Sequence, residues 1–153
     1  MNATDLQRYL HEHIPLSKPM AVSVVSIAGD SVVLGAPLAP NINHRDTVFG
    51  GSASALAILT AWSLLHTRLS AAELHCRLVI QRNTMEYELP IAGAFTARAS
   101  IDESEWSRFE RTLMRRGKAR ITTTSVLEYE GRDAGRFVGE FVGLVTPESG
   151  NTT

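Results

Sequence analysis

Apolar and polar residues follow two different periods along this chain, and the first is helical. Residues 4–13 place apolar side chains on one side at helical spacing, with Thr4 in position to cap the start and Pro15 to end the helix. The pattern predicts a short amphipathic lid helix within residues 1–15. Two β-branched runs follow in residues 21–38, and Gly29-Asp30 between them predicts a hairpin turn.

The next segment is apolar on every side of a helix. Residues 52–66 carry Ala and Leu all round, with a few Ser, Thr and His residues between them. A helix of this kind that is too short to span a bilayer belongs in a protein core. We therefore expect a buried central helix wrapped by a sheet.

The remainder of the chain is dominated by the two-residue period of strands. Residues 103–117 are the exception, because they place Trp106, Phe109 and Leu113 on one stripe, with acids early, arginines late and Gly117 at the end. Strands are predicted within residues 76–90, 94–101, 118–130 and 136–146.

The last predicted strand places several glycines on one face. Gly135, Gly139 and Gly143 alternate there with Phe137 and Phe141. Glycine inside a strand often marks the close approach of another backbone. The simplest expectation is that the buried helix lies against these glycines.

Composition limits the classes of protein to which the chain can belong. Its 153 residues suit one domain, spanning residues 1–153 with a frayed tail at 148–153, and a formal net charge of −1 argues against nucleic acid as a partner. We see no secretory signal and no membrane-spanning run. Cys76 is the only cysteine, which excludes an internal disulfide. A soluble cytoplasmic protein is expected.

Three motifs carry a resemblance to a known family. They are NxNxxxTxFGGS at residues 41–52, Tyr87 with Pro90 at the end of the third strand, and GKARI at residues 117–121. The chain resembles the thioesterase family typified by the YiiD carboxy-terminal domain. The resemblance implies an α+β hotdog fold, in which a curled antiparallel sheet of five to six strands wraps around a long central helix.

The resemblance also implies a substrate and an assembly. Hotdog domains of this kind act on acyl-CoA or acyl-carrier-protein thioesters, without a cofactor. They dimerise edge to edge, so a homodimer or a dimer of dimers with its site at the subunit interface is implied. Hydrolysis by water is our first expectation. A domain that binds the thioester without turning it over, and a dehydratase of the same fold, are the alternatives.

The chemistry of thioester hydrolysis favours the start of the central helix. Free N–H groups at a helix start can stabilise a developing oxyanion, and glycine lets a carbonyl approach them. We assign this role to the amides of Gly50 and Gly51; the alternative is that the glycines only allow tight packing. Phe49 and Ser52 flank them as candidate substrate contacts, although Ser52 is also placed to cap the helix.

The general base is harder to assign. A related hotdog pattern has His where this chain has Phe49, and an acid where it has Ile58, and the predicted helix contains no Asp or Glu. His44 and Asp46 are candidate bases in the loop, although a loop-capping or solvated role is the alternative for each. The remaining candidates for positioning water are Asn43, which could also cap its own loop, and Thr60, whose hydroxyl could instead bond back to the helix.

Other candidate groups are weighed in the same way. A basic run near the end of the second amphipathic helix could bind CoA phosphates or be a solvated helix end. Trp62 and Trp106 could line an acyl pocket or pack in the core. The basic run consists of Arg115, Arg116, Lys118 and Arg120.

Other catalytic chemistries find little support. No histidine follows His75, so the Ser-acid-His order of α/β-hydrolases cannot be assembled. His75 and Cys76 are neighbours on a predicted strand and point to opposite faces, which excludes a dyad and leaves Cys76 as a core residue. The histidine spacing gives no metal site.

Overall fold

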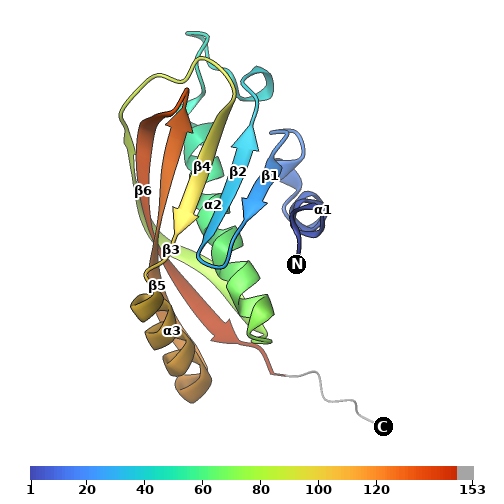
Figure 1. The fold of residues 1–153 in the computed structure, drawn as a ribbon, viewed down its shortest axis with the longest axis vertical. Coiled ribbons are helices and arrows are strands. Elements are labelled where there is room, and N and C mark those ends of the chain that lie inside the picture. The colour runs from blue at the N-terminus through green and yellow to red at the C-terminus, as the bar shows by residue number, and fades with distance from the viewer. Residues whose placement is uncertain (148–153) are drawn as a thin grey trace.

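A computed structural model describes residues 1–147, and its single sheet contains six antiparallel strands in the order β1-β2-β4-β5-β6-β3. The sheet curls around one long helix, α2 (Figure 1). This arrangement confirms the hotdog fold. The strands are β1 (Ser23–Ile27), β2 (Ser31–Ala36), β3 (Cys76–Tyr87), β4 (Phe95–Ser100), β5 (Lys118–Tyr129) and β6 (Arg132–Val145). The helices are α1 (Ala3–His13), α2 (Gly50–Ala71) and α3 (Glu103–Arg116), with short 3-10 turns at Pro15–Ser17 and Ala39–Asn41.

Helix α2 is the core element that the apolar sequence predicts. It has 22 residues, and side chains such as those of Leu56 and Leu64 are fully buried. It begins two residues before the expected start, at Gly50, and no side chain caps it. The expectation that Ser52 caps the helix is therefore wrong, because Ser52 already lies in its first turn. Within residues 1–147 no helix meets the length and hydropathy needed to cross a membrane.

Helix α1 forms where the sequence predicts a helix, but with a different cap. Asn2 accepts the backbone N–H of Asp5 at 2.8 Å and Asp5 accepts that of Asn2 at 3.5 Å, so the cap is Asn2 and not Thr4. Leu6 and Leu10 are fully buried. The helix lies beside β1, away from the loop that leads into α2 (Figure 1). It does not cover the start of α2.

Four stacked rings attach α1 to the second half of α2. The ring of Tyr9 stacks on His13 at 4.1 Å and on His66 at 4.5 Å, and His66 stacks on Trp62 at 4.7 Å between centroids. Burial lowers the pKa of His66 below its ordinary value, and the charge of His13 lowers that pKa further. The stack is therefore held together best when His66 is neutral.

This lowered pKa predicts that the protein loses stability in mild acid. The unfolded chain binds a proton at His66 as the pH falls through about 6.5, whereas the folded protein resists that proton, so the free energy of unfolding falls. We expect the Tm to drop between pH 7.5 and pH 5.5. The drop should be smaller in His66→Gln, measured by thermal unfolding at both pH values. An equal drop in wild type and variant would assign the effect to other groups.

The glycines of β6 face aromatic side chains and a neighbouring strand instead of the central helix. A Cβ at Gly139 would lie 2.5 Å from the ring of Phe137, and one at Gly135 would lie 2.9 Å from the carbonyl oxygen of Glu86 in β3. At Gly143 the nearest atom is in the ring of Phe109 in α3, at 3.0 Å. The expectation that α2 lies against these positions is wrong. The glycines make room for buried phenylalanine rings and for β3.

Helix α3 closes the end of the sheet that lies farthest from the start of α2 (Figure 1). Asp102 caps it by accepting the N–H of Ser104 at 2.9 Å, and Gly117 ends it with φ of 74°. It buries Trp106, whose ring packs under the guanidinium of Arg68 at 4.7 Å. Trp106 therefore packs in the core, the second of the two roles expected for it.

Candidate functional site

The loop before α2 is shaped by the side chain of Asn43. Its Oδ1 accepts the backbone N–H groups of Arg45 at 2.8 Å and Thr47 at 3.2 Å, and its Nδ2 donates to the hydroxyl of Thr47 at 3.0 Å. These bonds close a turn in which Asp46 takes a left-handed φ of 61°. Asn43 therefore caps its own loop, and this loop delivers the chain to the first turn of α2.

Three backbone donors, the amides of Gly50, Gly51 and Ser52, are free at the start of α2. The N–H of Phe49 is used by the carbonyl of Asn41 at 2.7 Å, and the N–H of Ala53 by the carbonyl of Phe49 at 3.0 Å. Between them, the amides of Gly50 and Gly51 donate to no acceptor within residues 1–147. Gly51 is exposed and Gly50 is half-buried, so a ligand oxygen can reach this turn. The positive end of the helix dipole favours a developing negative charge there.

A cavity of about 340 Å³ opens beside Gly50. It lies between the first turn of α2, the segment that follows β3, and the adjoining ends of β5 and β6. Residues that line it include Gly50, Ala53, Tyr87, Glu88, Leu127 and Ala134. A Cβ at Gly50 would lie 3.5 Å from the ring of Tyr87, an ordinary contact. A methyl group there would occupy the rim of the cavity without disturbing the fold.

Tyr87 and Glu88 bring polar groups to this cavity. The hydroxyl of Tyr87 donates to the carbonyl of Gly50 at 3.3 Å. The Oε1 of Glu88 accepts the Nε–H of Arg136 at 2.8 Å, and Arg136 also donates to Asp133 at 3.3 Å. The side chain of Glu88 is about one-third exposed. Glu88 thus supplies a carboxylate near the helix start, although α2 itself has none.

Nothing in the sequence around Glu88 marks it as a site residue. The lengths of α2 and β3, however, indicate that it lies beside the start of α2. Helix α2 is about 33 Å long at 1.5 Å per residue. Strand β3, with 12 residues, returns about 40 Å in the opposite direction. A strand of this length after so short a turn must end level with Gly50. The residues at its end, Tyr87 and Glu88, therefore arrive beside the free amides.

The other expected candidates lie outside the cavity. The hydroxyl of Thr60 is fully buried and donates to the carbonyl of Leu56 at 2.6 Å. This bond back to the helix is the alternative to a water-positioning role for Thr60. His44 and Asp46 are exposed in the loop and do not line the cavity. Phe49 is 57% exposed, and its ring lies so close to the Cα of Gly51 that a Cβ there would clash with it. Phe49 therefore lies beside the free donors.

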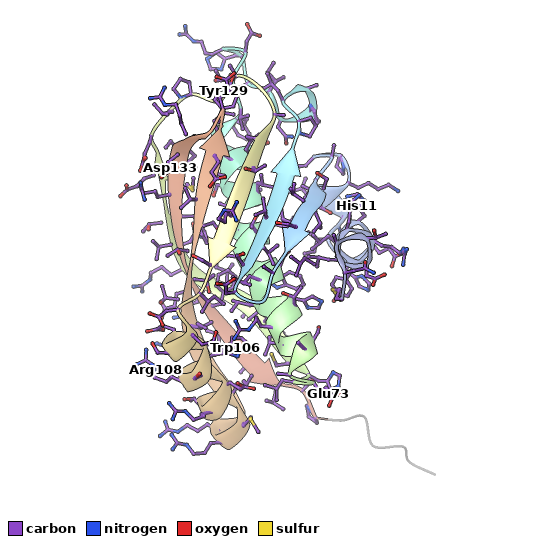
Figure 2. The ribbon with its side chains drawn as sticks, in the orientation of Figure 1. His11, Glu73, Trp106, Arg108, Tyr129 and Asp133 are labelled. Carbon is purple, nitrogen blue, oxygen red and sulfur yellow. The ribbon has the colours of Figure 1, made fainter. Side chains whose placement is uncertain are left out.

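The basic run does not meet the free amides within one chain. Lys118 begins β5 opposite Leu144, whereas Leu127 lines the cavity at the other end of the same strand. Seven residues separate Arg120 from Leu127, a distance of about 23 Å. In Figure 2, Arg108 of α3 lies in the lower part of the molecule and Asp133 of β6 in the upper part. A phosphate contact from Arg115 or Arg116 of the same subunit at this cavity is not supported.

Comparison of the sequence with known protein families agrees with the fold and the site. Residues 3–145 match the family described as "Putative thioesterase (yiiD_Cterm)". The chain belongs to this YiiD-type thioesterase family. The match includes the opening loop, the start of α2 and the end of β3, so every element around the free amides lies inside it.

Solved structures with the same fold extend this result. A protein of unknown function from Chlorobaculum tepidum TLS is 28% identical, with a TM-score of 0.89 and coverage of 94% of each chain. A putative thioesterase from Shewanella oneidensis is 24% identical, with a TM-score of 0.84 and coverage of 93% of this chain and 96% of its own. A probable thioesterase from Pseudomonas aeruginosa is 22% identical, with a TM-score of 0.80 and coverage of 94% and 96%. The last two show that this fold is shared.

The lone cysteine of this YiiD-type domain is not activated. Cys76 is half-buried at the start of β3, and burial raises the pKa of its thiol. A raised pKa leaves little thiolate at neutral pH, so the thiol is a poor nucleophile. Across residues 1–147, no three His, Cys, Asp or Glu side chains gather as metal ligands.

Proposed function

We propose that this protein hydrolyses acyl thioesters of CoA or of an acyl carrier protein, with the thioester carbonyl held by the amides of Gly50 and Gly51. One observation carries the proposal: both N–H groups lack a protein acceptor within residues 1–147 and stand at the start of a buried 22-residue helix beside a cavity. Such donors stabilise the oxyanion that forms when the carbonyl is attacked. Membership of a thioesterase family supports the same reaction.

Glu88 is the proposed acceptor of the proton from the attacking water. The water oxygen bonds to the acyl carbon, its proton passes to the carboxylate, and the carbon–sulfur bond breaks. The departing sulfur then takes up that proton from Glu88, which restores the carboxylate. His44 and Asp46 are exposed outside the cavity, so they are second choices for this step. Asn43 acts on the site through the loop shape that it fixes.

The working unit is proposed to be a homodimer joined through β3. This strand is the last in the sheet, and it exposes Val79 and Ile80. An unpaired apolar edge favours pairing with a second copy. If two β3 strands pair antiparallel, the Cys76 end of one lies beside the Tyr87 end of the other. The partner's basic run then comes to the end of the sheet that holds Gly50.

The dimer makes a prediction about the phosphates of the substrate. Arg115→Ala combined with Arg116→Ala should raise the KM for acyl-CoA several-fold, because two cations near the CoA phosphates are lost. The KM for an acyl thioester of N-acetylcysteamine, which has no phosphate, should not change. Steady-state kinetics with both substrates measures this. An equal change for both would show that the arginines act on the fold.

Thiol release from a panel of acyl-CoAs tests the proposed reaction. We expect turnover above the buffer rate, following free thiol with a chromogenic disulfide. The alternative is a domain that binds acyl thioesters without hydrolysing them. Measurable equilibrium binding with no thiol release at any chain length would establish that alternative.

A further inference from the structure

We infer that the acyl chain of the substrate lies in a separate apolar pocket along α2, and that Trp62 limits the length of chain this pocket accepts. The inference rests on the proposed thioester hydrolysis and adds the class of acyl group, which is medium-chain.

The pocket has a volume of about 240 Å³ and three walls. Ile14 and Met20 come from the segment after α1, Ile58 and Trp62 from α2, and Ile80 and Phe141 from the sheet. Ser17 is the one polar residue among those that line it, and its hydroxyl donates to the carbonyl of Ile14 at 2.7 Å. No free polar group of the lining residues remains, so the pocket suits a hydrocarbon.

The pocket shares one stripe of α2 with the proposed oxyanion donors. Ala55, Ile58 and Trp62 follow Gly51 by four, seven and eleven positions, so their side chains lie on the same side of the helix. Eleven residues of helix span about 17 Å. An acyl chain whose carbonyl binds at Gly51 can therefore run along α2 into the pocket and end at Trp62.

Trp62 is a fixed wall. Its indole N–H donates to the carbonyl of Leu78 at 3.4 Å, and its ring stacks on His66. His66 is in turn stacked against Tyr9 of α1. These contacts on two sides hold the indole in place between α1 and β3.

A larger cleft begins on the other side of the same indole. It has a volume of about 710 Å³ and is lined by Trp62 together with polar side chains such as His66, Glu73, His75 and Arg77. The indole of Trp62 therefore separates an apolar pocket from a polar cleft. Removing it would join the two spaces.

The volume of the pocket indicates the length of the chain. A space of 240 Å³ holds about eight groups the size of a water molecule, each about 30 Å³, and a methylene group is of similar size. The pocket therefore accommodates about eight carbons, and the stretch of helix between Gly51 and Ala55, about 6 Å long, is spanned by about four more, so the whole acyl group has about twelve carbons. Longer chains would have to displace Trp62.

Two variants with opposite expected shifts test this inference. Hydrolysis of saturated acyl-CoAs from two to sixteen carbons should be fastest near twelve carbons for the wild type. Trp62→Ala should raise kcat/KM for chains of fourteen and sixteen carbons at least tenfold relative to twelve carbons. Ile58→Phe, which fills the pocket, should shift the optimum to shorter chains. Circular dichroism of each variant reports whether it is folded.

The same panel of variants is measured for binding with non-hydrolysable thioether analogues of the acyl-CoAs. If nothing is hydrolysed but the preferred chain length in binding shifts in both variants, the inference stands and the proposed hydrolysis fails. If hydrolysis occurs and folded Trp62→Ala and Ile58→Phe keep the wild-type profile, the inference is overturned and the hydrolysis stands. Should Trp62→Ala not fold, the shift in Ile58→Phe alone decides.

Discussion

Glu88→Gln is expected to lower kcat for thioester hydrolysis by about 10²- to 10⁴-fold, the range by which general acid–base catalysis accelerates a reaction. The amide keeps the size of the side chain, and its oxygen can still accept the Nε–H of Arg136 that the carboxylate accepts at 2.8 Å. What it loses is the capacity to take a proton from water. Steady-state thiol release over a range of substrate concentrations measures the effect, and KM should change little.

The neighbouring carboxylate provides a matched control. Asp133 also accepts a hydrogen bond from Arg136, at 3.3 Å, but it does not line the cavity. Both ion pairs are exposed, so each substitution should change the free energy of unfolding by less than about 1 kcal/mol. Asp133→Asn should keep nearly full activity. If the two variants lose activity equally, Glu88 acts by holding Arg136 and the base lies elsewhere.

Gly50→Ala is expected to lower kcat/KM by about tenfold or more while the protein stays folded. The added methyl lies at the rim of the cavity and hinders a carbonyl from reaching the free amides, and losing one such donor entirely costs about 10²- to 10³-fold. The nearest atom of Tyr87 is 3.5 Å away, so the fold has room for it. Alanine is also the better helix former, by about 1 kcal/mol. Thiol release and thermal unfolding, measured on one preparation, separate the two effects.

A glycine-to-alanine change far from the cavity is the control for Gly50→Ala. Gly29 lies in the β1–β2 turn with nothing within 4 Å of a built Cβ, so Gly29→Ala should leave kcat/KM unchanged. A Gly50→Ala variant with full activity and an unaltered Tm would mean that the carbonyl does not bind at this turn.

The architecture could be predicted because its strongest signals are local. The apolar run of residues 52–66 has no polar face to turn to water, which places it in the core before any contact is known. The alternation along β5 similarly predicts one buried face, as found. The expected start of α2 lies two residues too late, because glycine is a poor helix former and the local sequence does not show that Gly50 and Gly51 belong to the first turn.

The site depends on contacts between distant residues, and these were harder to predict. The carboxylate near the free amides is Glu88, which follows β3, and its arrival there depends on the length and direction of that strand. Residues near Gly50 in sequence, such as His44 and Thr60, lie outside the cavity or are bonded within α2. The neighbour expected for Gly143 is wrong for the same reason, since the facing Phe109 comes from α3.

The stacked rings of α1 and α2 have a consequence for how selectivity could change in evolution. Tyr9 does not line the apolar pocket, yet it braces His66 and through it Trp62. Exchanging one aromatic residue near the amino end could therefore loosen the far wall and admit longer fatty substrates, while leaving every lining residue intact. Paralogues that differ only in this first helix could then divide a pool of acyl groups by size.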